Sequence, residues 1–583
     1  MSGKVATPII REIKDNRDEL KALEDELLST ADAKTQDIIM NYPTVYIHNW
    51  KNTDDFEVYV GESNNVFRRT REHYDESTNK TAWQYKLLEK DASLFIIGHE
   101  HFNKSLTLDI ENRLMHYMMS IDRVKEVHND RENPQSKYYT SDEFEEIFRK
   151  VWWGLRKRNK DLFPTESAIK DSAIYKASPL HKLTPEQERA RDQIIAKVAS
   201  AINKGKTKQL IFIEGEAGTG KTVLNSSTFY ELYCRAEEHK VKINCHLLVN
   251  HDEQITVYEQ IADKLGLTKE YGKIVSKPTT FINNHSESDP VDVAFIDEAH
   301  LLLTQGKQSY RGSNQLKDII DRARVTVVMF DENQILTTEQ YWEAKALEQY
   351  RKKAKKNNNY ILLDKQLRMH ADSATIDWID SFTKKGELKK IPKSSKYSVK
   401  VFDSPKQLDL EIRKKAKDKD SALSRVIATY DWEYSSIHKP EKRLKKYWEV
   451  LIDGWHKPWN RELESDLSKK DKKAIKGLSW AEQPQTIGEV GSTFTIQGFD
   501  LNYAGVILGP SVKYRNGKIV IDPSCSKNRK AKQNRTLSNG TSKKFGETLI
   551  QHEVRVLMTR GVDGLYIYAC DKELREALID ASK

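Results

Sequence analysis

A glycine-rich segment at residues 215–222, GEAGTGKT, has the spacing of a phosphate-binding loop, GxxxxGKT. An apolar run at residues 210–213 precedes it and a helical pattern follows it, as such a loop requires. Glycines let backbone N–H groups approach phosphates, while Lys221 is expected to reach the outer phosphates and Thr222 to hold Mg²⁺. The sequence thus predicts an ATP site bound by Gly215, Gly218, Thr219, Gly220, Lys221 and Thr222.

Two carboxylates, Asp297 and Glu298, follow the apolar run at residues 293–296. A carboxylate at the carboxyl end of a parallel strand faces the phosphate site. We expect Asp297 to complete the Mg²⁺ sphere and Glu298 to orient or deprotonate the attacking water. With the phosphate-binding loop, this pair predicts ATP hydrolysis. Nucleotide binding without turnover is the alternative.

Apolar, β-branched runs alternate with helical stretches after the loop's own strand: LIFIEG, INCHLLVNH, VAFIDEAH and VTVVMFDENQ. This alternation is typical of a parallel sheet with helical crossovers. A second α/β domain is expected to use YILLDKQ, YAGVILGP and LYIYACD as its buried strands. The predicted fold class is α/β, with parallel-sheet domains at residues 183–344 and 345–583.

Two segments of the first α/β domain resemble motifs of the superfamily 1 helicases. Residues 183–187 (LTPEQ) resemble the glutamine motif, which implies that Gln187 reads adenine. Residues 330–334 (FDENQ) resemble motif III, which implies that Gln334 senses the γ-phosphate. The spelling DEAH at residues 297–300 does not place the chain in superfamily 2, because the other motifs disagree.

Three segments of the second domain resemble motifs IV, V and VI of the same family: residues 363–368 (LDKQLR), 495–500 (TIQGFD) and 556–561 (VLMTRG). The resemblance implies that Gly498 belongs to the nucleotide site and that Arg368 and Arg560 are arginine fingers. A planar cation from a second domain stabilises transition-state charge. The likeness extends to the Schlafen-type helicase-like domain. It implies two RecA-like domains with ATP and Mg²⁺ (or Mn²⁺) as cofactors.

A second group of chemistry-bearing residues lies nearer the N-terminus. Tyr46 and Tyr59 lie on two β-type runs that antiparallel pairing would bring together. Arg69 and His73 are four residues apart and share one face of a predicted helix. Glu111 borders an apolar stripe, where a half-buried carboxylate is costly unless it binds a cation or hydrogen-bond donors.

As a set these residues resemble the GIY-YIG nuclease family. Residues 44–46 (TVY) stand for the first signature, with Thr and Val in place of Gly and Ile, and residues 59–61 (YVG) stand for the second. The arginine and histidine follow at the family's spacing. The asparagine of the family maps to Asn129, with Asn133 as the rival.

The resemblance also implies a role for each residue. Tyr46 is the general base, with His73 as its rival, and Arg69 holds the phosphate. Glu111 binds one divalent metal, Mg²⁺ or Mn²⁺, since oxygen ligands suit hard cations. Tyr59 supports the site.

Composition limits the other possibilities. At roughly 150 residues per domain, 583 residues suggest about four domain-sized units. The net charge of +9 permits a nucleic-acid partner, and the four cysteines contain no CxxC pair that would indicate a zinc site or a disulfide scaffold. No apolar run reaches the ~18–20 residues of a membrane span, and no signal-peptide core is present, so a cytoplasmic location is expected.

The N-terminal third of the chain divides into three parts. Residues 1–40 are a predicted helical segment, in which residues 8–30 read as an amphipathic helix that either dimerises the chain or packs on its own domain. Residues 41–153 form the predicted nuclease, a small α+β domain, and residues 154–182 a polar connector. Far downstream, the basic segment 526–544 is expected to be a mobile loop.

Together these features predict a metal-dependent endonuclease fused to a helicase-like ATPase that translocates on or remodels nucleic acid. DNA is the favoured partner, RNA stays open, and the resemblance suggests defence against invading DNA. Residues 247–251 (LLVNH), which resemble motif Ia, lack an aromatic side chain for base stacking. Two alternatives therefore stay open: an ATP-sensing switch that gates the nuclease without unwinding, and a nucleic-acid-binding ATPase with an inactive nuclease domain.

Overall fold

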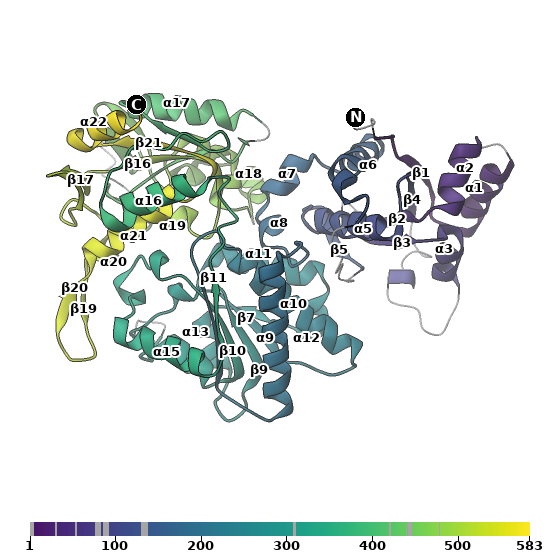
Figure 1. Ribbon diagram of the computed structural model, residues 1–583, viewed down its shortest axis with the longest axis horizontal. Coiled ribbons are helices and arrows are strands. Elements are labelled where there is room, and N and C mark those ends of the chain that lie inside the picture. The colour runs from purple at the N-terminus through teal and green to yellow at the C-terminus, as the bar shows by residue number, and fades with distance from the viewer. Residues whose placement is uncertain are drawn as a thin grey trace. The chain divides into compact units, whose positions relative to one another are not determined.

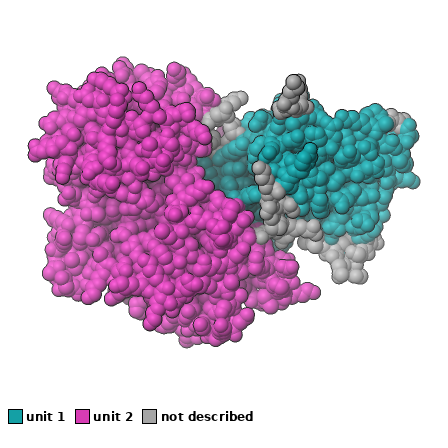
Figure 2. Space-filling view, viewed as in Figure 1, with its two compact units in different colours: residues 1–182, 258–273 teal, residues 183–257, 274–583 magenta. Residues whose placement is uncertain are grey.

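The computed structural model contains two compact units, each described by itself (Figure 2). Unit 1 comprises residues 1–182 and 258–273, and unit 2 comprises residues 183–257 and 274–583. The residues whose structure is described are 5–29, 32–52, 55–75, 83–85, 92–129, 138–306, 310–418, 421–438, 440, 446–476 and 478–583. Within them, no helix combines the length and the apolar character needed to cross a membrane.

Unit 1 is an α+β domain built on a five-stranded sheet with the order β1-β4-β2-β3-β5 (Figure 1). The strands are β1 (Ile9–Lys14), β2 (Thr44–Asn52), β3 (Asp55–Ser63), β4 (Ala92–Gly98) and β5 (Val124–Val127). The helices are α1 (Arg17–Ser29), α2 (Ala33–Asn41), α3 (Val66–Tyr74), α5 (Lys104–Met119), α6 (Phe144–Arg158), α7 (Glu166–Asp171), α8 (Ala173–Ala177) and α12 (Leu267–Tyr271). The predicted antiparallel pairing of the two tyrosine-bearing strands, β2 and β3, is confirmed.

The expectation of one helix over residues 8–30 is wrong for its first part. Residues 9–14 form β1, whose β-branched isoleucines suit an edge strand that pairs with β4. Helix α1 starts at Arg17, because the side chain of Asn16 accepts a hydrogen bond from a backbone N–H of the first turn. The apolar face of α1 serves its own domain rather than a second chain, since it buries Leu20, Leu23 and Leu27.

Residues 154–182, expected as a polar connector, contribute to the core of unit 1. Helix α6 continues to Arg158, and α7 and α8 follow it. Leu162 and Phe163 are fully buried, and Trp152 Nε1 donates to Pro164 O at 2.8 Å. A few large apolar side chains therefore anchor a segment whose overall composition is polar.

Unit 2 contains two parallel sheets, as predicted. The first has the strand order β11-β6-β10-β9-β7-β8. Its strands are β6 (Gln209–Gly215), β7 (Cys245–Leu248), β8 (Val275–Ser276), β9 (Val291–Ile296), β10 (Ala323–Phe330) and β11 (Tyr360–Leu363). Its helices are α9 (Pro185–Asn203), α10 (Lys221–Glu238), α11 (Asp252–Lys264, which runs on into unit 1), α13 (Pro278–Asn284), α14 (Gln315–Ile320) and α15 (Ala344–Lys356).

The second sheet has the order β12-β21-β16-β13 and is also parallel. Its strands are β12 (Ser398–Val401), β13 (Arg425–Ala428), β16 (Leu501–Leu508) and β21 (Gly561–Ala569), with helices α16 (Ser373–Lys385), α17 (Pro405–Ala416), α21 (Gly546–Met558) and α22 (Lys572–Ala581). The assignment of YILLDKQ to this sheet is wrong. That segment forms β11, which pairs with β6 of the first sheet, because α15 returns the chain to the edge beside β6.

Smaller elements complete unit 2: β14 (Glu449–Ile452), β15 (Trp455–Pro458), β17 (Val512–Arg515), β18 (Lys518–Ile521), β19 (Asn534–Thr536), β20 (Ser542–Lys544), α18 (Lys469–Ala474), α19 (Thr493–Ile496) and α20 (Arg529–Lys532). The basic segment 526–544 is therefore ordered and not a mobile loop. Arg535, 5% exposed, donates to the backbone oxygens of Thr304 and Thr338, and the ring of Phe545 stacks on Tyr341. We call residues 528–545 the strap, because they join the second sheet's chain to the first domain.

The placement of α1 in the core of unit 1 makes a stability prediction. Leu20→Ala empties a site that is 1% exposed and should lower the free energy of unfolding of unit 1 by about 2–5 kcal/mol. Hydrogen exchange of the β2 and β4 amides in the full chain measures this loss. Leu28→Ala on the same helix, where the side chain is 58% exposed, is the matched control and should cost less than about 0.5 kcal/mol. Equal effects of the two substitutions would contradict the placement.

Candidate functional site

The phosphate-binding loop lies at the carboxyl end of β6 and leads directly into α10. Gly218 and Gly220 have φ angles of +86° and +77°, in the left-handed region that favours glycine. A Cβ on Gly220 would lie 2.2 Å from Gln187 Nε2, so a side chain there would displace Gln187. Backbone conformation and space both require glycine at this position.

The ammonium group of Lys221 is held inside the loop. Its Nζ donates to the backbone oxygens of Gly215 and Glu216, each at 2.8 Å, and lies 3.7 Å from the carboxylate of Asp331. Lys221 and Asp331 are both buried. Because a buried cation must be paired, these oxygens hold Nζ in place, and phosphate oxygens can replace them.

The side chains expected to hold Mg²⁺ lie side by side. Thr222 Oγ1 donates to Asp297 Oδ2 at 3.1 Å. Hydroxyl and carboxylate oxygens are the ligands that Mg²⁺ prefers, so this pair fits the ion. The next residue, Glu298, has a φ of +46°, and its carboxylate lies 3.5 Å from His300 Nε2. A non-glycine residue in this conformation costs about 1 kcal/mol or more, and such strain concentrates at functional sites.

A continuous set of contacts links the loop to the second sheet. Gln334 Nε2 donates to Asp331 Oδ2 at 2.9 Å, and Gln334 Oε1 accepts from Arg560 Nη2 at 2.9 Å. Gln497 Nε2 donates to the backbone oxygen of Gln334 at 3.2 Å. We call Lys221, Asp331, Gln334 and Arg560 the sensor chain, because it runs from Lys221 of the loop to the second sheet.

Arg560 is a fully buried cation. Its Nε and Nη1 donate to the backbone oxygens of Val556 and Phe499. Burial, helped by the nearby cation of Arg368, lowers the pKa of Arg560 to about 10. The guanidinium therefore stays charged at pH 7 and is fixed by three separate partners.

Three further ion pairs lie at or next to the loop. Arg368 Nε pairs with Asp500 Oδ1 at 2.6 Å, and the Cβ of Arg368 packs against the loop. Arg555 Nη2 and Lys384 Nζ each lie 2.5 Å from a carboxylate oxygen of Glu216, a residue of the loop itself. Two cations, Arg555 of α21 and Lys384 of α16, thus hold Glu216 of the loop.

Gln187 and Gly498, both expected at the nucleotide, contact other groups. Gln187 Nε2 donates to the backbone oxygen of Gly220 at 3.3 Å, and its Oε1 accepts from the backbone N–H of Thr184. Gln187 thereby braces the loop while capping α9. Gly498, with a φ of +86°, lies against Gln254.

In unit 1, Tyr46 of β2 and Tyr59 of β3 lie on one face of the sheet, with ring centroids 6.1 Å apart. The register places Gly61 opposite Tyr46, and a Cβ on Gly61 would lie 2.6 Å from the phenol of Tyr46. The glycine of the YVG segment therefore makes room for the tyrosine of the TVY segment.

Helix α3 brings Arg69 and His73 to the same phenols. The hydroxyl of Tyr46 lies 3.2 Å from His73 Nε2, and Arg69 lies beside Tyr46 and Tyr59. Burial, with Tyr59 next to it, raises the pKa of Tyr46 well above its usual range. Burial, with His48 and Arg69 nearby, lowers the pKa of His73 to about 3. Both side chains are therefore neutral at pH 7.

Glu111 of α5 completes this group from the other side. It is 4% exposed, and its Oε1 accepts from Asn129 Nδ2 at 2.9 Å. The same amide donates to the backbone oxygen of Val60 at 2.6 Å, so it joins Glu111 to β3. A carboxylate oxygen is a hard ligand, and Glu111 fits Mg²⁺ or Mn²⁺. The rival asparagine, Asn133, lies outside the described residues.

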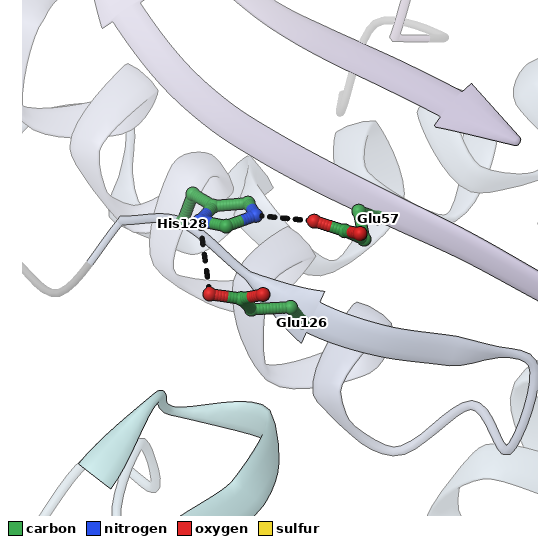
Figure 3. Close-up of side chains that lie close together, drawn as sticks. All are labelled: Glu57, Glu126 and His128. Atoms are coloured by element: carbon green, nitrogen blue, oxygen red, sulfur yellow. Dashed lines mark hydrogen bonds and ion pairs between the residues drawn. The ribbon is translucent and has the colours of Figure 1, made fainter. Parts of the chain in front are cut away.

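A second polar cluster joins β3 to the end of β5, and its member on β3, Glu57, lies two residues from Tyr59 (Figure 3). His128 Nε2 is 3.0 Å from Glu57 Oε2, and His128 Nδ1 is 3.4 Å from Glu126 Oε1. An imidazole between two carboxylates ties the end of β5 to β3. Since Asn129 is the next residue along the chain, this cluster helps to fix the amide that contacts Glu111.

Comparison with known proteins bears on unit 2. The family model described as Schlafen group 3, DNA/RNA helicase domain, matches residues 208–571. The chain belongs to this family. The Saccharomyces cerevisiae protein YPL245W is 31% identical over 439 residues, which are 69% of this chain and 91% of that protein. The Schlafen-type domain makes the chain a helicase-like ATPase acting on nucleic acid.

Solved helicase structures share only a distant likeness with the chain. A Pif1 helicase from Candida albicans is 15% identical, covers 41% of this chain and 55% of its own, and has a TM-score of 0.20. A structure of two coordinating Pif1 helicases that unwind forked DNA is 12% identical, with 69% and 96% covered and a TM-score of 0.28. At these scores neither structure bears on the assignment.

The structure brings residues into the Schlafen-type site that the sequence had not singled out. Asp331 follows a buried strand just as Asp297 does, and that pattern could have singled it out. Arg555 gives no such signal, because its contact with Glu216 joins residues 339 positions apart. In unit 1, His48 alternates with Tyr46 along β2, which places both on one face.

The position of Lys221 makes an ATPase prediction for the Schlafen-type domain. Lys221→Ala removes the buried cation from the loop and should lower the rate of ATP hydrolysis by about 100-fold or more. A phosphate-release assay measures this rate. Lys204→Ala, an exposed lysine after α9, is the control and should leave the rate unchanged. Hydrolysis at the same rate in both variants would contradict the site.

The low pKa of His73 makes a pH prediction for unit 1. The folded pKa is about 3 against an ordinary 6.5, so the unfolded chain binds a proton first as the pH falls. Stability should therefore be full at pH 7 and should drop by on the order of 1–2 kcal/mol by pH 5. Hydrogen exchange of β2 and β3 measures the change. His73→Gln should flatten this dependence, whereas His101→Gln, at a partly exposed position, should not.

Proposed function

We propose that the chain joins two activities: a GIY-YIG type endonuclease in unit 1, and a helicase-like ATPase in unit 2 that moves along or remodels nucleic acid. One observation carries the nuclease half. Side chains from β2, β3, α3, α5 and the end of β5 meet in one group that matches the family pattern: Tyr46, Tyr59, Arg69, His73, Glu111 and Asn129.

These groups suit phosphodiester hydrolysis. Arg69 offers a fixed cation for a non-bridging phosphate oxygen. Glu111, oriented by Asn129, would hold a divalent ion, and such an ion neutralises phosphate charge when it is bound. Tyr46 and His73 form a hydrogen-bonded pair, and the resemblance offers Tyr46, with His73 as rival, as the base that deprotonates the attacking water.

In unit 2 we assign roles by position in the loop and the sensor chain. Lys221 binds the outer phosphates, Thr222 and Asp297 hold Mg²⁺, and Glu298 activates water. Nucleotide binding should draw the amine of Lys221 from its present oxygen partners toward phosphate.

Residues of both parallel-sheet domains take the remaining roles. Arg560 and Arg368 stabilise transition-state charge, and Gln334 senses the γ-phosphate because it bonds both Asp331 and Arg560. We assign to Gln187 the role of bracing the loop through its hydrogen bond to Gly220. Gly498 allows the turn of its segment next to Gln497.

The sensor chain favours coupling of hydrolysis to movement of the second sheet, which is what translocation needs. The absence of aromatic residues at 247–251 favours the second candidate, an ATP-sensing switch that gates the nuclease without unwinding. We favour translocation on DNA, with defence against invading DNA as the biological role. ATPase activity that ignores added DNA and RNA would favour the switch.

The two activities are predicted to separate by mutation. Glu111→Gln should abolish cutting of DNA with Mg²⁺ or Mn²⁺ and leave ATP hydrolysis unchanged, because Glu111 lies in unit 1. Lys221→Ala should abolish ATP hydrolysis, and it should keep cutting only if the nuclease works without ATP. Gel assays on defined DNA and RNA substrates, with and without ATP, measure both.

Glu145→Gln is the matched control for the nuclease, since this exposed carboxylate lies on α6, outside the site. It should cut like the wild type. Wild-type protein that leaves every substrate intact with either metal ion would overturn the nuclease proposal. Loss of ATP hydrolysis in Glu111→Gln would contradict the division of labour between the units.

A further inference from the structure

A buried carboxylate–imidazole pair lies beside the proposed nuclease residues. His48 Nδ1 is 2.5 Å from Asp15 Oδ2, and both side chains are fully buried. The other oxygen of Asp15 accepts from the hydroxyl of Tyr74. A carboxylate bonded at both oxygens is a fixed acceptor, so the hydrogen of His48 is on Nδ1 and its Nε2 carries a lone pair.

That lone pair is unused. Among the described residues, His48 Nε2 is buried and has no hydrogen-bond partner. Leaving a buried acceptor without a partner costs about 1–3 kcal/mol, so such atoms in native proteins call for an explanation. A catalytic role is one of the accepted explanations.

The ring of His48 lies inside the group of proposed nuclease side chains. Its centroid is 5.4 Å from that of Tyr46, 5.4 Å from that of His73 and 6.0 Å from that of Tyr59. The ring of Trp83 is 6.0 Å away and stacks on Tyr59. His48 reaches this place because it alternates with Tyr46 on β2 and pairs with Tyr59 across the sheet.

Neither residue that the resemblance offers as the base is suited to accept a proton from water at pH 7. Tyr46 is a buried phenol whose pKa is raised, so it does not ionise at pH 7. His73 has both ring nitrogens bonded, Nε2 to Tyr46 and Nδ1 to Gln84, and its pKa is lowered to about 3 by burial and by His48 and Arg69. A base with pKa far from the working pH is inefficient.

We propose that His48, held by Asp15, is the general base of the nuclease site. This inference rests on the proposed nuclease function. A bound water gives its proton to His48 Nε2 while its oxygen forms a bond to phosphorus. The bridging P–O bond breaks, and the leaving oxygen takes a proton from solvent. The imidazolium that results is stabilised by Asp15 and then returns its proton to solvent, so the enzyme ends unchanged.

Several titratable and charged groups face His48 and share in any pH dependence of the reaction: Asp15, Tyr46, Tyr59, Arg69, His73 and Tyr74. Among these described groups, the Asp15–His48 pair is the one that combines a fixed N–H with an open lone pair. Asp15 is therefore a positioning residue, and His48 is the group that takes the proton.

The test uses the full chain and a DNA substrate that the wild type cuts with Mg²⁺ or Mn²⁺. His48→Asn should lower the single-turnover rate of cutting by about 100- to 10,000-fold, with KM within about twofold and ATP hydrolysis unchanged. Asp15→Asn should also slow cutting, because it no longer fixes the tautomer. His99→Gln, which changes another buried histidine of unit 1, should cut like the wild type.

Chemical rescue separates a base from a structural pair. Imidazole added to His48→Ala should restore part of the cutting rate, and the restored rate should rise with pH through the pKa of free imidazole. Tyr74→Phe removes one hydrogen bond to Asp15 but leaves the contact between Asp15 and His48. The cutting rate of this variant should fall by less than about tenfold. Hydrogen exchange will show whether His48→Ala folds. If it does not fold, the pH profile of cutting by Asp15→Asn decides whether His48 is the base.

Two failures can be told apart. Wild-type rates in His48→Asn, or no imidazole rescue of folded His48→Ala, would overturn the assignment of His48 while the nuclease stands. An unchanged pH profile in Asp15→Asn would overturn it too. A wild type that cuts nothing, or a Glu111→Gln variant that cuts normally, would overturn the nuclease proposal itself.

Discussion

Unit 2 is organised around a buried carboxylate, that of Asp331. Removing a charge from water costs several kcal/mol unless a partner compensates for it. Lys221 lies 3.7 Å away and Gln334 donates at 2.9 Å, so both are drawn to the same oxygen. Strand β10 lies between β6 and β9 in the first sheet. Asp331, at the end of β10, therefore lies between the loop that follows β6 and Asp297, which follows β9. Pairing this charge thus sets the geometry of the nucleotide site and, through Gln334, the position of Arg560.

Unit 1 also buries polar side chains, and there they lie among aromatic rings. Three of these pairs join different elements: Tyr46 with His73, Glu111 with Asn129, and His48 with Asp15. Gly61 makes the space in which two of these elements can meet. In both units, buried polar groups are therefore paired with side chains that are distant in sequence.

Prediction from the sequence worked best where local spacing carries the signal. The loop, the parallel strands and the pairing of the tyrosine-bearing strands all follow from periodicity and short motifs. It failed where one long-range contact decides the outcome. The isoleucines of residues 9–14 form β1 because β4 offers an edge, and β11 joins the first sheet because β6 does. The contact of Arg555 with Glu216 and the pairing of Asp15 with His48 have no local signal at all.

The strap has a mechanical consequence for the ATPase. Its Arg535 is buried and bonded to two backbone oxygens of the first domain, while Phe545 stacks on Tyr341 at 3.8 Å. None of these residues belongs to the loop or to the sensor chain. While these contacts last, the two sheets cannot separate widely. A basic segment whose composition suggested only a loop therefore limits how far the two sheets can move apart.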